Sequence, residues 1–289
     1  MALLTPVGGP TLPGLPAADR PLVVGVLNVT PDSFSDGGRF LDHRAAVAHG
    51  HRLAADGADL VDVGGESTRP GAGRVPAAEE CRRVLPVVRD LTADGVPVSI
   101  DTTRAAVARA AVEAGAVLVN DVSGARQDPG MAGLLAGLRV ACVLMHWRAP
   151  SAVMASFARY DDPAGDVVRE VAERVDAVVA AGVDPAAIAV DPGIGFAKEA
   201  AHNWAVLAGV DRLAALGRPV MVGVSRKRFL GALLAGPDGQ PRQPQDRDAA
   251  SAAVAALVAA RGVWAVRAHD ARATRDAVEV GARWAREAT

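Results

Sequence analysis

The stretch that decides the fold is "PLVVGVLNVTPDSFSDGGRF", residues 21–40, where a run that is apolar up to Asn28 leads directly into a polar loop. A short apolar run that ends at turn residues is typical of a buried strand. A longer, alanine-rich segment of helical periodicity follows it, which predicts one strand–loop–helix unit. Asn28 stands where the strand is expected to end, and a polar side chain at that point calls for an explanation.

The same alternation recurs along the rest of the chain. Helix-length segments separate the apolar runs, the pattern of βα units around a parallel sheet. Eight such units in 289 residues predict a single-domain (β/α)8 TIM barrel over residues 21–289, since this fold typically takes about 250 residues. A doubly wound open sheet is the alternative, but the glycine fingerprint after its first strand is absent. The predicted strands cover residues 22–28, 58–65, 97–101, 116–122, 139–146, 187–193, 219–225 and 263–269.

Local signals support the alternation of strands and helices. Asp42, and Asp101 with Thr102 further on, stand where helix N-caps are expected, and Gly57 and Gly115 stand where helices should end. The segment "GPDGQPRQPQDRD", residues 236–248, predicts a surface loop before the last helix–strand pair. Residues 1–20 carry many prolines and glycines, no basic cluster and no sustained apolar run, so we expect a flexible arm rather than a signal peptide.

Composition excludes several classes of function. A net charge of -2 and a pI of about 6.3 argue against a nucleic-acid binder. Cys81 and Cys142 lack C-x-x-C spacing, which indicates a reducing compartment and neither a disulfide nor a zinc framework. No stretch reaches the roughly 18 apolar residues that a membrane span needs. We therefore expect a cytoplasmic protein without a membrane partner.

Polar or charged side chains stand at or just after nearly every predicted strand end. Because active sites of such barrels form at the carboxyl ends of the strands, these side chains should converge on one mouth. Any single Asn or Asp there could equally be a cap or a rim hydrogen bond, but the full set predicts a site for a polar heterocycle and an anion together. The set comprises Asn28, Asp62, Glu66, Asp101, Asn120, Asp121, His146, Asp191, Ser225, Lys227, Arg267 and His269.

Two features indicate the anion. The loop "GGESTRPGAGR", residues 64–74, combines paired glycines, hydroxyls and two arginines, which suits phosphate oxygens. Arg267 and His269 are one residue apart, so strand alternation points both to the same face. An isolated histidine would more often be structural, but two cations at one rim favour an anion site.

Four other residues suit a heterocycle: Asp101, Asn120, Asp191 and Lys227. Carboxylates accept from ring N–H and amino groups, and a lysine donates to a ring carbonyl, as a 2-amino-4-oxopyrimidine edge requires. Helix capping is the alternative for the aspartates. It fits Asp101 but fits Asp191 less well, because Pro192, Gly193 and Gly195 delay any helix start.

The chain resembles the dihydropteroate synthase family, and its actinobacterial members especially. The motifs that carry the likeness run in family order from residue 25 to residue 270: "GVLNVTPDSFSDGG", "DVGGESTRPGA", "SIDT", "NDVSG", "VLMHW", "DPGIGFAK", "VGVSRKRFLG" and "VRAHD". The resemblance implies a homodimeric folate-pathway enzyme that uses Mg²⁺ and joins 6-hydroxymethyl-7,8-dihydropterin diphosphate to 4-aminobenzoate, giving 7,8-dihydropteroate and diphosphate. Sulfonamides compete for the aminobenzoate pocket in this family.

The resemblance also implies residue roles. The pterin would be held by Asp101, Asn120, Asp191 and Lys227. The diphosphate would be received by Asn28, Thr68, Arg69, Arg267 and His269, with Asn28 also on the magnesium ion. The aminobenzoate pocket would involve Phe34, Pro70, Phe196 and Ser225. The residues expected to act in catalysis are Asn28, Arg69, Lys227, Arg267 and His269.

Those substrates imply electrostatic rather than nucleophilic catalysis. Positive charge that develops on the CH₂ carbon can spread into an electron-rich ring, so loss of diphosphate can precede attack by the amine. Magnesium and the cations would neutralise the departing diphosphate. A dedicated base is dispensable, because an aromatic amine is already neutral at pH 7. The loops at residues 30–40 and 66–74 are expected to close over the site.

Departures from the family pattern are small. Arg228 stands where many members have a serine that can meet the aminobenzoate carboxylate, and Ala268 stands where a larger apolar residue is common. Two other functions are the alternatives: a non-catalytic pterin-binding paralogue, and a pterin-binding methyltransferase that passes a methyl group to a corrinoid. The first should lack a phosphate or pterin residue. The second would not be expected to carry the complete "TRPGA" and "RAHD" motifs.

Overall fold

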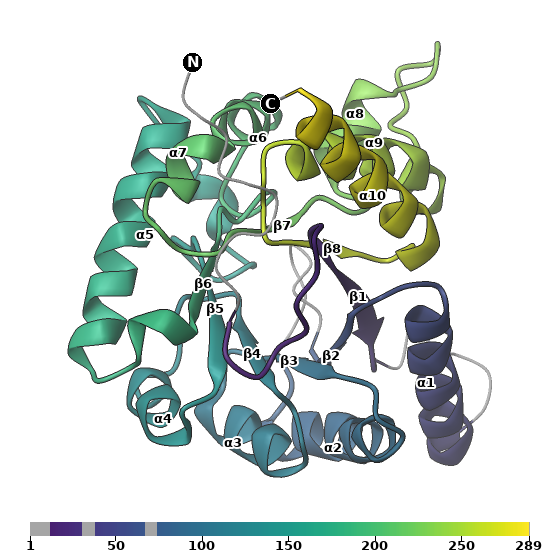
Figure 1. The fold of residues 1–289 in the computed structure, drawn as a ribbon, viewed down its shortest axis with the longest axis vertical. Coiled ribbons are helices and arrows are strands. Elements are labelled where there is room, and N and C mark those ends of the chain that lie inside the picture. Colours follow the sequence, from purple (N-terminus) through teal and green to yellow (C-terminus); the bar gives the residue numbers. More distant parts are fainter. Residues whose placement is uncertain (1–11, 31–37, 67–73, 289) are drawn as a thin grey trace.

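The computed structural model describes residues 12–30, 38–66 and 74–288, with the backbone alone described over residues 38–42. Eight parallel strands form one sheet in the order β6-β5-β4-β3-β2-β1-β8-β7. A bridge between Val190 and Val220 links β6 to β7 and brings the sheet around into a nearly closed barrel (Figure 1), which confirms the predicted fold. The strands are β1 (Leu22–Asn28), β2 (Leu60–Gly64), β3 (Val98–Asp101), β4 (Leu118–Asp121), β5 (Ala141–Met145), β6 (Ile188–Asp191), β7 (Met221–Gly223) and β8 (Ala265–Ala268).

Helices follow the strands and cover the outside of the barrel (Figure 1). They are α1 (Gly38–Ala55), α2 (Ala77–Ala93), α3 (Ala105–Glu113), α4 (Met131–Leu138), α5 (Pro163–Ala180), α6 (Ala200–Ala208), α7 (Val210–Ala214), α8 (Arg228–Leu233), α9 (Asp248–Ala259) and α10 (Ala271–Glu287). Short 3₁₀ turns are η2 (Met154–Phe157), η3 (Pro185–Ala187) and η4 (Pro244–Arg247). No helix in the described part of the chain is long and apolar enough to cross a membrane.

Alternate residues of each strand face opposite sides of the sheet, which divides the core in two. In β2, Val61 and Val63 pack in the larger cluster between the sheet and the helices. Leu60 packs in the smaller cluster inside the barrel, with residues such as Leu118 and Val143. Asp62 lies two residues after Leu60 in β2 and so also faces inward. The inward side of this strand therefore changes from apolar to polar toward its carboxyl end.

Most predicted element bounds differ from the observed ones by a few residues, and two predicted caps are wrong. Helix α1 begins at Gly38, so Asp42 lies inside it. Helix α3 begins at Ala105, whose N–H donates to Asp128 Oδ2 at 2.8 Å, and Asp101 does not cap it. The glycine predictions are confirmed, since Gly57 and Gly115 have φ of 101° and 110°, the left-handed region that glycine tolerates.

The amino-terminal segment closes the floor of the barrel. Residues 1–11 of the predicted arm lie outside the described residues. The described part differs from a flexible arm, because Leu12 is buried in the inner cluster. Arg20 is also buried and donates to both carboxylate oxygens of Asp59, at 2.7 and 2.8 Å. A fixed segment at this end separates the barrel floor from solvent.

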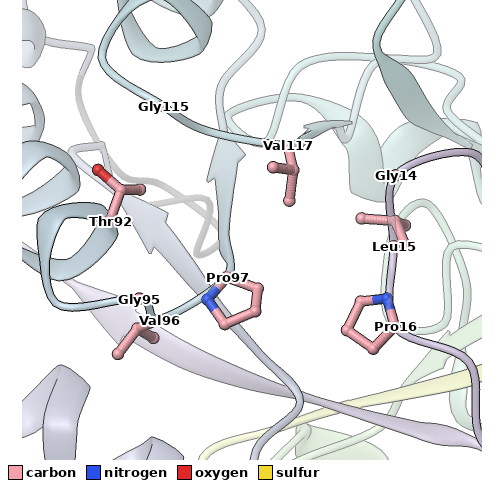
Figure 2. A pocket seen from close by; sticks show the side chains of 9 residues that line it. All are labelled: Gly14, Leu15, Pro16, Thr92, Gly95, Val96, Pro97, Gly115 and Val117. Carbon is pink, nitrogen blue, oxygen red and sulfur yellow. The ribbon is translucent and has the colours of Figure 1, made fainter.

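A groove of about 420 Å³ lies between this segment and the loops that enter β3 and β4 (Figure 2). It is therefore at the amino-terminal ends of the strands, opposite the polar mouth. Its lining is mostly apolar and small, and it contains no charged side chain: Gly14, Leu15, Pro16, Thr92, Gly95, Val96, Pro97, Gly115 and Val117. The groove offers no group for the chemistry that the sequence predicts.

Asp59→Ala is expected to lower the free energy of unfolding by about 3 kcal/mol, because it leaves the buried Arg20 guanidinium without its main counter-charge. It also removes the acceptor for the Val23 N–H, which lies 2.7 Å from Asp59 Oδ2. Urea unfolding measures the change. Asp56→Ala is the matched control, since Asp56 pairs with the exposed Arg272 and should contribute less than about 1 kcal/mol. Equal effects of the two variants would contradict the account.

The predicted loop at residues 236–248 is largely exposed and includes the short turn η4. Arg247 is its exception, being buried. Its guanidinium donates to Arg242 O at 2.6 Å and to Arg226 O at 2.8 Å. This arginine therefore ties the loop to the turn that follows β7, on the side of the barrel where the site lies.

Candidate active site

The polar residues predicted at the strand ends meet because the strands are in register. Asn28 pairs with Gly64 across β1 and β2, and Gly64 pairs with Asp101 across β2 and β3. Asp101 in turn pairs with Asn120 in β4. The inward polar layer consists of Asn28, Asp62, Asp101, Asn120, Asp191 and Arg267, and it lies toward the carboxyl ends of the strands, above the apolar layer that fills the barrel.

Arg267 is the centre of this layer. Its Nε donates to Asp62 Oδ2 at 2.6 Å and its Nη2 donates to Asp101 Oδ2 at 2.7 Å. Asn120 Nδ2 donates to the same Asp62 oxygen at 3.0 Å, which orients the amide. One guanidinium fork thus bridges two strands that lie far from it in sequence. It bonds directly to Asp101 and shares the Asp62 oxygen with Asn120.

Sequence reasoning named Asp62 in the ring of polar residues but gave it no role in the site. It is fully buried, and its Oδ1 has no hydrogen-bond partner among the described residues. Its inward parity with Leu60 in β2 was the available signal. The unpaired oxygen remains an acceptor for a donor from a ligand or a water molecule.

Two carboxylates share one cation here, and the titration of Asp101 is shifted. Burial raises the pKa of Asp101 to about 7, and the nearby Asp62 carboxylate adds to the rise while Arg267 opposes it. For Arg267, burial lowers the pKa, but the two aspartates outweigh it and raise the pKa above its ordinary value. The arginine stays charged, and Asp101 is close to its titration point at neutral pH.

Across the mouth, Lys227 interacts with Asp191 of the inward polar layer. Asp191 Oδ1 accepts from Gly193 N at 2.6 Å, and burial raises its pKa against the attraction of Lys227. Lys227 Nζ donates to Ile194 O and lies 5.2 Å from the centre of the Phe196 ring. Burial lowers the pKa of Lys227 to about 8, although Asp191 opposes the shift. Lys227 and Phe196 therefore adjoin on this side of the mouth.

The turn after β7 positions Ser225 and His269. The His269 N–H donates to Ser225 Oγ at 3.1 Å, and the imidazole Nδ1 lies 2.9 Å from the same oxygen. The hydroxyl has one proton, which it can donate to Nδ1 of a neutral ring whose own proton is on Nε2. Arg226, with φ of 60°, is held by both carboxylate oxygens of Asp248 at 2.7 Å.

Asn28 ends β1 beside Gly64, where a side chain would meet it only at ordinary contact distance. A Cβ on Gly64 would lie 3.8 Å from Asn28 Oδ1 and 3.5 Å from the Asp101 Cβ. The described residues contain no group of three acidic, histidine or cysteine side chains placed to hold a metal ion. Asn28 therefore offers an amide oxygen without an accompanying carboxylate cage.

Other predicted residues lie elsewhere. Phe34, Thr68, Arg69 and Pro70 are outside the described residues, as are most of the two loops that we expect to close. Asp121 faces away from the mouth and accepts from Ser123 N and Ala125 N, at 2.7 and 3.0 Å. Its position in the ring of polar residues thus reflects a structural role. Likewise, Glu66 accepts from Arg74 Nε and Val75 N, both at 3.1 Å, at the end of its loop.

These side chains define a class of protein. The fold is a (β/α)8 barrel, and its mouth brings buried carboxylates, an amide, a lysine and an arginine together at the carboxyl ends of the strands. Such a site can accept from and donate to a polar ring while a cation faces an anion beside it. The chain is therefore a barrel enzyme of the kind that binds a hydrogen-bonding heterocycle.

Comparison with known proteins identifies the family. Residues 24–269 match the family model described as pterin binding enzyme. Dihydropteroate synthase from Mycobacterium leprae is 55% identical over 263 residues, covering 91% of this chain and 93% of that protein. The chain belongs to the pterin-binding enzyme family and, within it, to the dihydropteroate synthases, transferases of folate synthesis.

Solved structures agree with this assignment. Xanthomonas albilineans dihydropteroate synthase with 4-aminobenzoic acid is 48% identical, with a TM-score of 0.85 and coverage of 94% of both chains. The same enzyme in complex with 7,8-dihydropteroate is 47% identical, with a TM-score of 0.81 and coverage of 94% of this chain and 95% of that one.

Proposed function

We propose that the chain joins 6-hydroxymethyl-7,8-dihydropterin diphosphate to 4-aminobenzoate and releases 7,8-dihydropteroate and diphosphate. The observation that carries this proposal is the inward polar layer, in which the Arg267 fork bridges Asp62 and Asp101 opposite the Asp191–Lys227 pair. The Xanthomonas albilineans complexes with 4-aminobenzoic acid and 7,8-dihydropteroate support the choice of substrates.

The pterin is assigned to the buried acids and the lysine. Asp101 and Asp191 are acceptors for ring N–H and amino groups, and Lys227 is a donor for the ring carbonyl. Asn120, which donates to Asp62, has its amide oxygen left to accept. The proposal therefore gives each polar atom of the 2-amino-4-oxopyrimidine edge a partner of opposite hydrogen-bonding type.

The diphosphate is assigned to Asn28, Arg267 and His269, with Thr68 and Arg69 expected from the resemblance. Asn28 suits Mg²⁺, because a hard cation takes oxygen ligands and keeps waters and substrate oxygens around few protein groups. The lack of a three-ligand cluster among the described residues fits this arrangement. When bound there, the ion would supply Lewis-acid stabilisation to phosphate oxygens.

Catalysis in this proposal acts on the leaving group. Arg267 is held by Asp62 and Asp101, so its charge is fixed before the C–O bond breaks and little reorganisation is needed. A His269 ring that accepts from Ser225 at Nδ1 carries its proton on Nε2, a donor type that suits a phosphate oxygen as negative charge grows. The pterin ring takes up the positive charge on the CH₂ carbon. The neutral aromatic amine then attacks, and its proton leaves to water.

Product formation tests the proposal. Purified protein with the pterin diphosphate and Mg²⁺ should form dihydropteroate, detected by chromatography, only when 4-aminobenzoate is added. Diphosphate release should match product one to one. Tight pterin binding without product would favour the non-catalytic paralogue. Methyl transfer from a methylfolate to a corrinoid would favour the methyltransferase.

Pterin affinity should fall below neutral pH. Burial raises the pKa of Asp101 to about 7, so the carboxylate acceptor is present above that value and is lost as pH falls through it. At the limit, the Kd should rise about tenfold for each pH unit below 7. Calorimetry from pH 5 to 8 measures it. Asp101→Asn is the control, and its weak binding should lack this pH dependence. A flat wild-type profile would contradict the assignment.

A homodimer is part of the same proposal, since the family usually forms one. Helices α9 and α10 pack against each other beside α8 (Figure 1), and both carry exposed apolar side chains. Leu257, Val280 and Trp284 are 66%, 65% and 74% exposed. Trp284→Glu should convert the dimer to a monomer in analytical ultracentrifugation. Leu233→Glu is the comparison variant, because it makes a similar change at an exposed apolar side chain of α8, outside α9 and α10. An unchanged mass for Trp284→Glu would move the interface elsewhere.

Cytoplasmic location and sulfonamide binding complete the proposal. Cys81 and Cys142 are both free thiols, consistent with a reducing compartment. Sulfonamides should compete with 4-aminobenzoate for the pocket beside Phe196, as expected from the family. The prediction is tested by inhibition that added 4-aminobenzoate relieves.

A further inference from the structure

The chain has only two lysines, Lys198 and Lys227, against 29 arginines. Both lysines bond to one loop, residues 192–199, which connects β6 to α6. Lys227 Nζ donates to Ile194 O from the pterin side of the loop. Lys198 Nζ donates to Gly193 O at 3.0 Å and to Phe196 O at 3.2 Å. In a chain that otherwise uses arginine, two lysines that bond to one loop indicate a role in positioning that loop.

Residues 193–196 of this loop, to which both lysines bond, form a tight turn. Phe196 N donates to Gly193 O at 3.0 Å, and Gly195 has φ of 83°. Lys198 bonds to the carbonyls at both ends of this turn, and Lys227 bonds to one inside it. Phe196, at the end of the turn, packs against Ala149, Met154 and Ala197. The turn therefore decides where the Phe196 ring lies.

Lys198 is itself held by a series of hydrogen-bonded side chains. Its Nζ lies 2.9 Å from His146 Nδ1, and His146 Nε2 lies 3.0 Å from Glu170 Oε2. Burial and the Lys198 charge lower the pKa of His146 to about 4, so its ring is neutral near pH 7. The neutral ring accepts from Lys198 at Nδ1 and donates to Glu170 from Nε2. All three ammonium protons of Lys198 then have an acceptor.

Glu170 is itself held by Arg148, whose Nε lies 2.9 Å from Glu170 Oε2. Arg148 also donates to Phe157 O at 3.1 Å and stacks 3.7 Å from the centre of the Tyr160 ring. The loop after β5 and the loop after β6 are thus joined through Glu170, His146 and Lys198. An arginine at position 198 would not meet the three acceptors in the same way, because its donors lie in a plane at fixed spacing.

We propose that Lys198 is a positioning residue for aminobenzoate: it holds the Gly193–Phe196 turn, and through it the Phe196 ring, in the place that the amine substrate requires. This inference rests on the proposed function, because it assigns the Phe196 side of the site to 4-aminobenzoate. It distinguishes the two lysines, with Lys227 acting on the pterin and Lys198 on the second substrate.

Steady-state kinetics of Lys198→Met, with both substrates varied, tests the inference. The KM for 4-aminobenzoate should rise about tenfold, because two loop carbonyls lose their donor, while kcat and the KM for the pterin diphosphate stay within about twofold. The assays are run just below pH 7, because burial lowers the pKa of Lys198 to about 7. Tyr160→Phe is the matched control, since it removes one bond to the same loop, from Tyr160 Oη to Ala197 O at 3.0 Å, and should change the KM less than Lys198→Met does.

If Lys198→Met does not fold, Glu170→Gln provides a second test. It weakens the hydrogen bond of Glu170 to His146, which supports Lys198, and should also raise the KM for 4-aminobenzoate. An unchanged KM for 4-aminobenzoate in the folded variants would overturn the inference, as would an equal rise in the KM for the pterin diphosphate. Equal effects of Tyr160→Phe and Lys198→Met would also overturn it. Absence of product from the wild-type protein would instead show that the proposed function fails, and the inference with it.

Discussion

Arg267→Met is expected to lower kcat/KM by about a thousandfold, the upper range for loss of one preorganised electrostatic group in an active site. The reason lies in its two partners. Arg267 is the only cation bonded to Asp62 and Asp101 in the described site, so the variant leaves two buried carboxylates facing the diphosphate. Both the attraction for the leaving group and the orientation of Asp101 are lost.

Arg267→Lys is the informative comparison. It keeps the positive charge, but a lysine cannot reproduce the planar fork that reaches two carboxylates 2.6 and 2.7 Å away. We expect it to recover less than a tenth of the lost kcat/KM, an order-of-magnitude figure for one charge-assisted bond. Steady-state kinetics and circular dichroism of both variants measure activity and folding. A folded Arg267→Met protein with activity near wild type would remove the arginine from the mechanism.

Lys227→Ala should weaken pterin binding by about a hundredfold or more, because it removes the donor for the ring carbonyl and the cation that most stabilises the Asp191 carboxylate. Its thermal midpoint should change little. Burial lowers the pKa of Lys227 to about 8, so the charged form is less favourable in the folded protein than in the unfolded chain.

The pH dependence of stability follows with a definite sign. Because the pKa of Lys227 is lowered in the folded protein, the buried charge reduces the free energy of unfolding of wild type at all pH values below about 8. This destabilisation decreases as the pH rises toward the ordinary pKa of lysine. The thermal midpoint of Lys227→Ala, relative to that of wild type, should therefore be higher near pH 7 than near pH 10. Calorimetry for binding and thermal melts for stability provide the two readouts. Wild-type pterin affinity in the variant would refute the role of Lys227.

The fold was predictable because each strand carries its own signal. Asp101, Asn120 and Asp191 were expected to meet because they stand at strand ends, and the register of the parallel barrel brings them together. The cap at Asp42 was mispredicted because the preceding residues also adopt a helix, which begins at Gly38. Such ends depend on backbone conformations that the local pattern does not determine.

The missed parts of the site depend on contacts between distant residues. Asp62 meets Arg267 across 205 positions of sequence, and its pairing follows from barrel closure rather than from any nearby residue. Lys198 was part of a family motif, but its bond to His146 requires β5 and β6 to be neighbours. The packing of Leu12 and Arg20 against the floor likewise needed the closed barrel, because their proline- and glycine-rich context is typical of a loose arm.

In the proposed mechanism, this site activates the leaving group and not the amine. Positional isotope exchange tests it most directly: pterin diphosphate with ¹⁸O in the bridge between the CH₂ carbon and phosphorus is incubated with the protein and Mg²⁺, without 4-aminobenzoate. If the C–O bond breaks before the amine attacks, the label should spread into the non-bridging oxygens of recovered substrate, at a rate comparable with turnover. Label that stays in the bridge, in protein that turns over normally once 4-aminobenzoate is added, would contradict the claim and place amine attack in the bond-breaking step.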